Sequence, residues 1–240
     1  MKWRFLIPNL FTLAAMLCGF FSILLSLEGE VHYKMAAQFI MLAMILDGLD
    51  GTLARRLKGS SEFGAELDTY VDMTAFGLAP AVLIYQVTLQ NYDIVWRVLM
   101  TSLVVLSGVI RLARFKVKDT ERGQGGYTGL PITACGGWVA IFVFLSETRS
   151  FSLERGPLTV IFIAGVLTMI TLQISNIRYP KPTKVMAVFV PSIILVLLLF
   201  LKEVNIAIGA AIAILLLGAG YVIIGPFFAA RQKLDQRVPN

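Results

Sequence analysis

Charged residues are scarce in this sequence, and it has no long polar segment. Asp, Glu, Lys and Arg together make up 15% of the 240 residues, whereas a soluble globular domain carries about 25%. Hydrophobic residues reach 57%, and the mean hydropathy is +0.78. This composition excludes an ordinary water-soluble domain, a disordered chain and a collagen-like fibre.

Cysteine and histidine are nearly missing as well. Cys18 and Cys135 stand alone in apolar stretches, without the spacing of a disulfide framework. His32, the single histidine, falls in a predicted short loop that is remote from the aspartates described below. We therefore expect neither a disulfide scaffold nor a zinc or copper centre.

Uncharged runs of about 20 residues, the length that crosses a bilayer, recur along the chain. The first run exceeds the core of a signal peptide and lacks a clear cleavage site, so we expect a permanent span in a mature chain that starts near Met1. The sequence predicts an all-α, polytopic membrane protein that forms a single integral domain over residues 1–240. About eight transmembrane helices are predicted, at 7–27, 34–57, 65–88, 93–114, 128–147, 157–177, 185–201 and 206–229.

Basic residues are distributed unevenly between the two sides of this predicted bundle. With eight spans both termini share one side, and that side holds 16 of the 21 Lys and Arg residues. By the positive-inside rule, both termini are predicted to be cytoplasmic. Topology and attraction to anionic lipid headgroups therefore explain the net charge of +6, and no nucleic acid partner is expected.

Four aspartates interrupt the apolar pattern at helical spacing. Asp47 and Asp50 come near the end of the second predicted span, and Asp68 and Asp72 come near the start of the third. One aspartate at the centre of a transmembrane helix costs about 2.5–3.5 kcal/mol on an insertion scale, so four of them require compensation. The short connection at 58–63 makes the two helices antiparallel neighbours, which brings the two acidic faces together.

The facing carboxylates predict a site for divalent cations, because four like charges at this range repel strongly unless cations lie between them. Oxygen ligands without histidine or cysteine suit hard ions such as Mg²⁺, Mn²⁺ or Ca²⁺. Gly51 and Gly64 leave room for a bulky ligand, and Arg55 can make a bidentate contact to a phosphate. The pattern indicates phosphoryl transfer. An ion-coupled transporter, whose intramembrane acids carry cations or protons, is the alternative from another class.

At these residues the sequence resembles the CDP-alcohol phosphotransferase family, whose signature reads D-x-x-D-G-x-x-A-R, a spacer, and G-x-x-x-D-x-x-x-D. Every signature position matches: Asp47, Asp50, Gly51, Ala54, Arg55, Gly64, Asp68 and Asp72. The resemblance implies a membrane enzyme that uses two divalent metal ions to move a phospho-alcohol group from a CDP-linked donor to an acceptor hydroxyl. It implies that the four aspartates are metal ligands and that Asp72 is also the general base. The implied nucleotide contacts are Gly51, Ala54, Arg55 and Gly64.

Four further segments resemble the phosphatidylserine synthase branch of this family: Ile7–Thr12, Phe76–Ala81, Arg111–Phe115 and Tyr127–Pro131. In the last segment, branch members often carry a second proline two positions past the first, where this chain has Thr133. The branch implies CDP-diacylglycerol as the donor, L-serine as the acceptor and CMP as the leaving group.

Arg111 and Arg114, one turn apart at the end of the fourth span, are candidate ligands for the serine carboxylate. Arginines at such a place also anchor a span by reaching lipid phosphates. An acceptor that bears a phosphate would use arginines too, so synthases of phosphatidylglycerol phosphate or phosphatidylinositol phosphate are the alternatives within the family. We expect an integral protein of the cell (inner) membrane whose catalytic motif at 47–72 faces the cytoplasm. The apolar spans at 157–229 are expected to line a groove for acyl chains and to support a homodimer.

Overall fold

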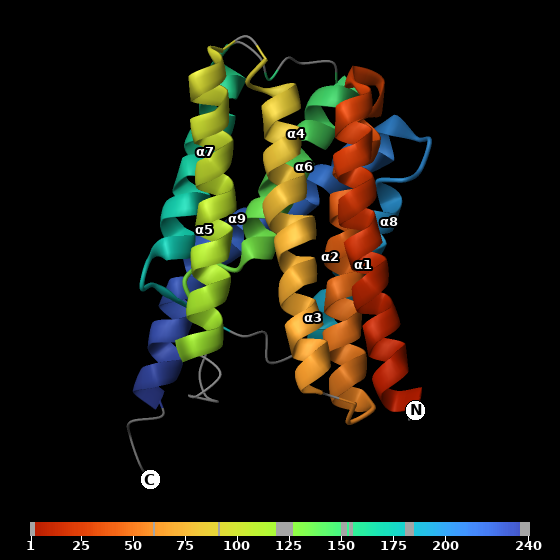
Figure 1. Cartoon of the computed structure of the whole chain (residues 1–240), viewed down its shortest axis with the longest axis vertical. Helices are drawn as coiled ribbons and strands as arrows, with labels where there is room; N and C mark the ends of the chain where they lie inside the picture. The colour runs from red at the N-terminus through yellow and green to blue at the C-terminus, as the bar shows by residue number, and fades with distance from the viewer. Residues whose placement is uncertain are drawn as a thin grey trace.

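A computed structural model describes residues 3–59, 61–90, 92–118, 127–149, 153, 156–180 and 185–235. Helices dominate this part of the chain (Figure 1), which confirms the all-α prediction. The long helices are α1 (Trp3–Glu28), α2 (Tyr33–Arg56), α3 (Glu62–Asp72), α4 (Ala79–Val87), α5 (Ile94–Lys118), α6 (Ile132–Arg149), α7 (Pro157–Ile174), α8 (Val185–Leu198) and α9 (Val204–Asp235). The short elements are the 3-10 helix η1 (Glu30–His32), the π-helical segment η2 (Met73–Leu78), and the antiparallel strands β1 (Tyr127–Thr128) and β2 (Arg178–Tyr179).

Six helical segments in the described part are long and apolar enough to cross a membrane. They run over Trp3–Glu28, Glu30–Arg56, Glu62–Val87, Ile94–Val117, Pro157–Ile174 and Val204–Ala229. The predicted integral membrane protein is thus supported, but the predicted count of eight spans is not confirmed. α6 and α8 form where the fifth and seventh spans are predicted. α8 has only 14 residues, or about 21 Å of helix against a hydrocarbon core of about 30 Å.

The N-terminal end of α1, the C-terminal end of α9 and the turn between α2 and α3 lie at the same end of the helix bundle (Figure 1). The connection between α4 and α5 lies at the opposite end. Met1 and the basic residues at 119–126 and 181–184 lie outside the described residues. The cytoplasmic position of the end that holds the α2–α3 turn stays a prediction from the basic residues.

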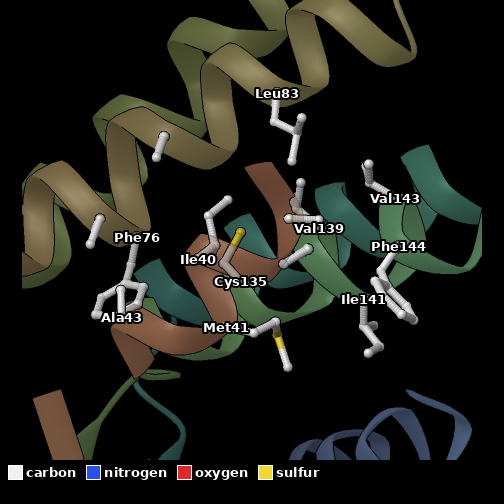
Figure 2. Close-up of a cluster of buried hydrophobic side chains, with 14 of the residues drawn as sticks. Ile40, Met41, Ala43, Phe76, Leu83, Cys135, Val139, Ile141, Val143 and Phe144 are labelled. Atoms are coloured by element: carbon white, nitrogen blue, oxygen red, sulfur yellow. The ribbon is translucent and has the colours of Figure 1, made fainter. Parts of the chain in front are cut away.

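Side chains from α2, the η2–α4 segment and α6 meet in the core (Figure 2). Ile40, Phe76 and Val139, one from each of these three elements, are all fully buried. Gly136 of α6 permits this packing, because a Cβ at that position would lie 3.2 Å from the ring of Phe76. Phe76 lies about one turn after Asp72, in η2. Its packing in the core therefore fixes the position of the C-terminal end of α3, which carries the acidic residues.

The turn between α2 and α3 has clear stop and start signals. Arg55 and Arg56 end α2, where cations offset the helix dipole. Ser61 caps α3, because its Oγ accepts a hydrogen bond of 3.0 Å from the N–H of Gly64. The chain therefore reverses over a few residues, and α3 runs antiparallel to α2 (Figure 1), as the short connection predicts.

α1 packs against this turn through the backbone of Arg4, one helical turn before Pro8. Pro8 is inside α1 and has no N–H to donate to the carbonyl oxygen of Arg4 one turn earlier. That carbonyl oxygen faces the turn so closely that a Cβ on Gly59 would lie 1.9 Å from it. Gly59 in turn donates its N–H to the carbonyl oxygen of Ala54 at 2.9 Å. Glycine at position 59 thus lets α1 close one side of the space beside the acidic faces of α2 and α3.

Candidate active site

Three of the four predicted aspartates converge between α2 and α3. Asp47, Asp50 and Asp68 each offer one carboxylate oxygen, and the three oxygens lie within 4.8 Å of one another. Asp47 and Asp50 are nearly one turn apart on α2, and Asp68 reaches the same point from α3. No other group of three potential metal ligands occurs in the part of the chain that the structure describes. The predicted meeting of the two acidic faces is confirmed.

Burial makes this cluster costly without a cation. Asp50 is only 5% exposed, and its Oδ2 has no hydrogen-bond partner among the described residues. A buried carboxylate oxygen without a partner is unfavourable, and like charges beside it add to the cost. A divalent cation would supply the missing partner, and a donor set of carboxylate oxygens fits a hard ion. The residues present therefore fit the metal ions that the sequence predicts.

Asp72 lies one turn beyond Asp68 and outside the group of three oxygens, with a partner of its own. Its Oδ2 is 3.9 Å from Nη1 of Arg111 on α5, and both side chains are largely buried. Asp72 is also the last residue of α3 before the π-helical segment η2. Such segments change the direction in which a helix presents its side chains and are frequent at functional sites. The structure thus places Asp72 at the edge of the cluster, where it faces a cation from another helix.

A cavity of about 250 Å³ opens beside the aspartates. Its walls come from α1, α2, α3 and the turn between α2 and α3. All four predicted nucleotide contacts and two of the aspartates line it: Gly51, Ala54, Arg55, Gly64, Asp50 and Asp68. Six of the eight signature residues, which the sequence spreads over two helices, therefore surround one space.

Two glycines keep this cavity open. A Cβ on Gly64 would lie 3.0 Å from Oδ1 of Asn9 and 3.2 Å from Oγ of Ser61. A Cβ on Gly51 would lie 3.5 Å from Nη1 of Arg55. The guanidinium of Arg55 is oriented by a hydrogen bond of 3.3 Å to Oγ1 of Thr52. The cavity thus combines a cation at its wall with carboxylates beside it, an arrangement suited to a metal-bound phosphate group.

Three residues of α1 line the same cavity, although sequence reasoning gave them no role. They are Pro8, Asn9 and Thr12, and they belong to the segment Ile7–Thr12 that carries part of the family resemblance. The signal that could have found them is polarity, because Asn9 and Thr12 are one turn apart at the start of an otherwise apolar span. Oγ1 of Thr12 donates to the carbonyl oxygen of Pro8 at 3.1 Å.

A larger cavity of about 490 Å³ lies between α4 and α5, nearer the other end of the bundle. No Asp, Glu, Lys, Arg or His is among the residues that line it. Its lining thus has no carboxylate to hold a divalent cation and no charged group to bind a phosphate, whereas the smaller cavity has both, so we place the chemistry in the smaller cavity. The acyl-chain groove and the homodimer expected at 157–229 stay predictions.

The two predicted acceptor arginines face different partners. Arg111 is 6% exposed, faces Asp72, and has its guanidinium 5.3 Å from the centre of the Phe115 ring. Arg114 donates to four backbone carbonyl oxygens at 2.6–3.3 Å, those of Thr128, Gln173, Ile174 and Ser175. Arg111 is therefore placed beside the aspartates, whereas Arg114 is engaged with the backbone.

Comparison with known proteins agrees with this geometry. The chain matches the model of the CDP-alcohol phosphatidyltransferase family over residues 5–175. It is 33% identical over 204 residues to the CDP-diacylglycerol–serine O-phosphatidyltransferase of Helicobacter pylori, with 84% of each chain covered. It is 34% identical over 181 residues to the archaetidylserine synthase of Methanothermobacter thermautotrophicus, covering 73% of this chain and 70% of that relative. It is 29% identical over 174 residues to the CDP-diacylglycerol–serine O-phosphatidyltransferase of Bacillus subtilis, covering 72% of this chain and 89% of that relative. The family model covers residues 5–175, and six of the eight signature residues line one cavity; the chain belongs to the CDP-alcohol phosphatidyltransferase family.

Proposed function

We propose that this protein transfers the phosphatidyl group of CDP-diacylglycerol to the hydroxyl of L-serine, forming phosphatidylserine and CMP. The observation that carries the proposal is the convergence of Asp47, Asp50 and Asp68 beside a cavity lined by the signature residues of the family. The names of the three relatives described above support serine as the acceptor, since two are serine O-phosphatidyltransferases and the third is an archaetidylserine synthase.

Two divalent ions, Mg²⁺ or Mn²⁺ and less favourably Ca²⁺, would be held by Asp47, Asp50, Asp68 and Asp72. When bound, such ions screen the carboxylates, polarise the diphosphate of the donor and stabilise the charge on the departing CMP. Asp50 supports this assignment most directly, because its buried Oδ2 has no partner among the described protein atoms.

The nucleotide end of the donor would occupy the cavity of about 250 Å³. Gly51, Ala54 and Gly64 let it approach the backbones of α2 and α3 closely, because none of them carries a side chain larger than a methyl group. Arg55 would contact a phosphate oxygen with its guanidinium. These contacts hold the phosphorus in position for in-line attack.

Asp72 would act as the general base. The serine oxygen forms a bond to the lipid-bearing phosphorus while its proton moves to the Asp72 carboxylate. The bond between that phosphorus and the CMP oxygen breaks, and CMP leaves as an anion. Arg111, 3.9 Å from Asp72, would bind the serine carboxylate and so keep the hydroxyl next to the base.

The proposed location is the cell (inner) membrane, with the α2–α3 turn on the cytoplasmic side. The orientation rests on the uneven distribution of Lys and Arg, of which 16 of 21 fall on that side of the predicted topology. A site at this end of the helices lets the cytidine head of the donor reach water while its acyl chains remain in the bilayer. α7, α8 and α9 would supply apolar surface for those chains and for a second copy of the protein.

The test of the proposed function is acceptor-dependent CMP release. Purified protein in detergent receives CDP-diacylglycerol, Mn²⁺ or Mg²⁺, and either L-serine, glycerol 3-phosphate or inositol phosphate. We expect CMP release with serine and none with the other two. Release with a phosphorylated acceptor alone would overturn the acceptor but keep the reaction type. No release with any acceptor, together with cation flux in vesicles, would favour the transporter alternative.

A further inference from the structure

Arg114 connects the end of α5 to two segments that are distant in sequence. Its Nη1 donates to the carbonyl oxygen of Ile174 at 2.6 Å. Its Nη2 faces the carbonyl oxygens of Thr128, Gln173 and Ser175 at 3.3, 3.0 and 2.6 Å. The guanidinium is thus shared between the end of α7 and strand β1. Its Nε is buried and has no hydrogen-bond partner among the described residues, so the contacts of the guanidinium with the backbone run through Nη1 and Nη2.

These contacts complete the hydrogen bonding at the end of α7. The last carbonyl groups of a helix have no partner within it and need one from elsewhere. Here the carbonyl oxygen of Leu172 accepts from the N–H of Leu130 at 3.1 Å and from Oγ of Ser175 at 2.8 Å. The carbonyl oxygens of Gln173 and Ile174 accept from Arg114. A cation at this end of a helix is also favourable for the helix dipole.

Gly129 allows the backbone after strand β1 to lie against Gln173 and Arg114. Its φ of +81° is in the left-handed region that favours glycine. A Cβ there would lie 2.3 Å from the carbonyl oxygen of Gln173 and 2.5 Å from Nη2 of Arg114. The N–H of Gly129 donates to the carbonyl oxygen of Ile177 at 2.8 Å. Backbone therefore packs closely against Nη2 of Arg114, and an acceptor carboxylate would have to displace main-chain carbonyl groups to reach that nitrogen.

We propose that Arg114 is a positioning residue, which locks the end of α5 to α7 and β1 and thereby holds Arg111 beside Asp72. Arg111 is one turn before Arg114 on the same helix, so the axial position of the Arg111 guanidinium depends on where that end of α5 is fixed. The inference rests on the proposed function, in which Arg111 binds the acceptor and Asp72 is the base. It replaces the predicted acceptor contact of Arg114.

The test is a double-mutant cycle on the full-length protein with Arg114→Lys and Arg111→Ala. Lysine keeps the charge of Arg114 but cannot reach four carbonyl oxygens. A displacement of about 1 Å can cost up to about 10²-fold in rate, so we expect Arg114→Lys to lower kcat/KM for serine by about tenfold or more. Activity is expressed per CMP-binding site, which removes any loss of folded protein from the comparison. CMP binding itself should be unchanged.

The informative quantity is the effect of Arg114→Lys after Arg111 has been removed. If Arg114 acts through Arg111, Arg114→Lys should change kcat/KM of the Arg111→Ala protein by no more than about twofold. Multiplicative losses would show that Arg114 contacts the acceptor or acts independently, and would overturn the proposal. An unchanged kcat/KM in the single Arg114→Lys variant would overturn it equally.

Two further variants make the cycle robust. Arg97→Lys is the matched control on the other half of α5, where the guanidinium packs on the Tyr85 ring at 4.0 Å, and it should leave kcat/KM nearly unchanged. If Arg114→Lys does not fold, Arg114→Gln replaces it in the cycle, because its shorter amide side chain can donate to a carbonyl oxygen at this site but cannot span all four. A failure of the proposed function is recognised separately, since the unaltered protein would then release no CMP with serine.

Discussion

Glycines near the aspartates and glycines in α9 have opposite surroundings. A Cβ on Gly59 or Gly64 would approach atoms of α1 to 1.9 and 3.0 Å. A Cβ on Gly209, Gly218 or Gly220 of α9 would meet nothing within 4 Å. Glycine therefore permits close approach of α1 near the aspartates, whereas at these three positions of α9 it faces open space in the described part of the chain. The tight region lies within residues 5–175, which the family model matches, and α9 lies beyond them.

This contrast shows where the fold is constrained by chemistry. In α1, α2 and α3, small residues leave a cavity whose walls carry charge, so any added atom competes either with a neighbouring helix or with a ligand. At Gly209, Gly218 and Gly220 of α9, an added methyl group meets no atom of the described residues within 4 Å, whereas at Gly225 it would lie 3.2 Å from the Tyr179 ring. The predictions below separate the two regions, in order of decreasing effect.

The largest effect is expected for Asp72→Asn. Loss of a general base typically lowers the rate by about 10²–10⁴-fold, and the amide cannot accept the serine proton. CMP binding should persist, because Asp72 lies outside the group formed by Asp47, Asp50 and Asp68. The measurements are kcat for CMP release and CMP affinity. Glu62→Gln, an exposed carboxylate on the same helix, is the control, and loss of CMP binding in Asp72→Asn would contradict its role as the base.

Gly64→Ala tests the tight region next. Its Cβ would stand inside the cavity proposed for the nucleotide, 3.0 Å from Oδ1 of Asn9 and 3.2 Å from Oγ of Ser61, and a clash with the nucleotide of about 1.4 kcal/mol corresponds to about tenfold weaker binding. We expect CMP affinity to fall by more than stability does, because the helix propensity of alanine offsets part of the crowding of Asn9 and Ser61. Equal falls in affinity and stability would mean that the variant disturbs the fold and not the nucleotide site.

Gly220→Ala tests α9, at a position where a Cβ would meet no atom within 4 Å in the part of the chain that the structure describes. In open space the substitution should stabilise α9 by at most about 1 kcal/mol through helix propensity, with CMP release unchanged. Thermal midpoints and size-exclusion mass are measured together. A fall in stability accompanied by dissociation to a smaller particle would show that a second copy packs on this face, which would sharpen the predicted homodimer.

The smallest effect is expected for the exposed ion pair between Glu66 of α3 and Lys116 of α5. Both side chains are substantially exposed, and such pairs contribute about 0–1 kcal/mol. Glu66→Gln with Lys116→Gln should therefore change stability little, and salt should reduce the difference further. A large loss of activity would instead mean that this pair, and not the contacts of Arg114 with α7 and β1, holds Arg111 beside Asp72.

The sequence was sufficient to predict the acidic part of the site. The spacing of Asp47 and Asp50, the spacing of Asp68 and Asp72, and a short connection determine that the two acidic faces meet, since each depends only on helix geometry. The structure brings three of these aspartates together. Asp72 lies outside this group of three and faces an arginine from α5, a contact that helical periodicity cannot predict.

The parts that could not be predicted depend on contacts between distant segments. Asn9 lines the cavity only because α1 packs on the α2–α3 turn, where the free carbonyl oxygen of Arg4 meets Gly59. Arg114 looks equivalent to Arg111 in sequence, but it bonds to carbonyl groups 59–61 residues away at the end of α7. The apolar run 185–201 is long enough for a span, yet its helix stops at Leu198 and turns.

The proposed metal site is tested most directly by Mn²⁺ binding to the purified protein, followed by electron paramagnetic resonance with and without CMP. We expect the unaltered protein to bind Mn²⁺, CMP to strengthen this binding, and Asp68→Asn to weaken both because it removes one of the three converging carboxylates. If Asp68→Asn binds Mn²⁺ with unchanged affinity and an unchanged response to CMP, the converging aspartates are not the metal site.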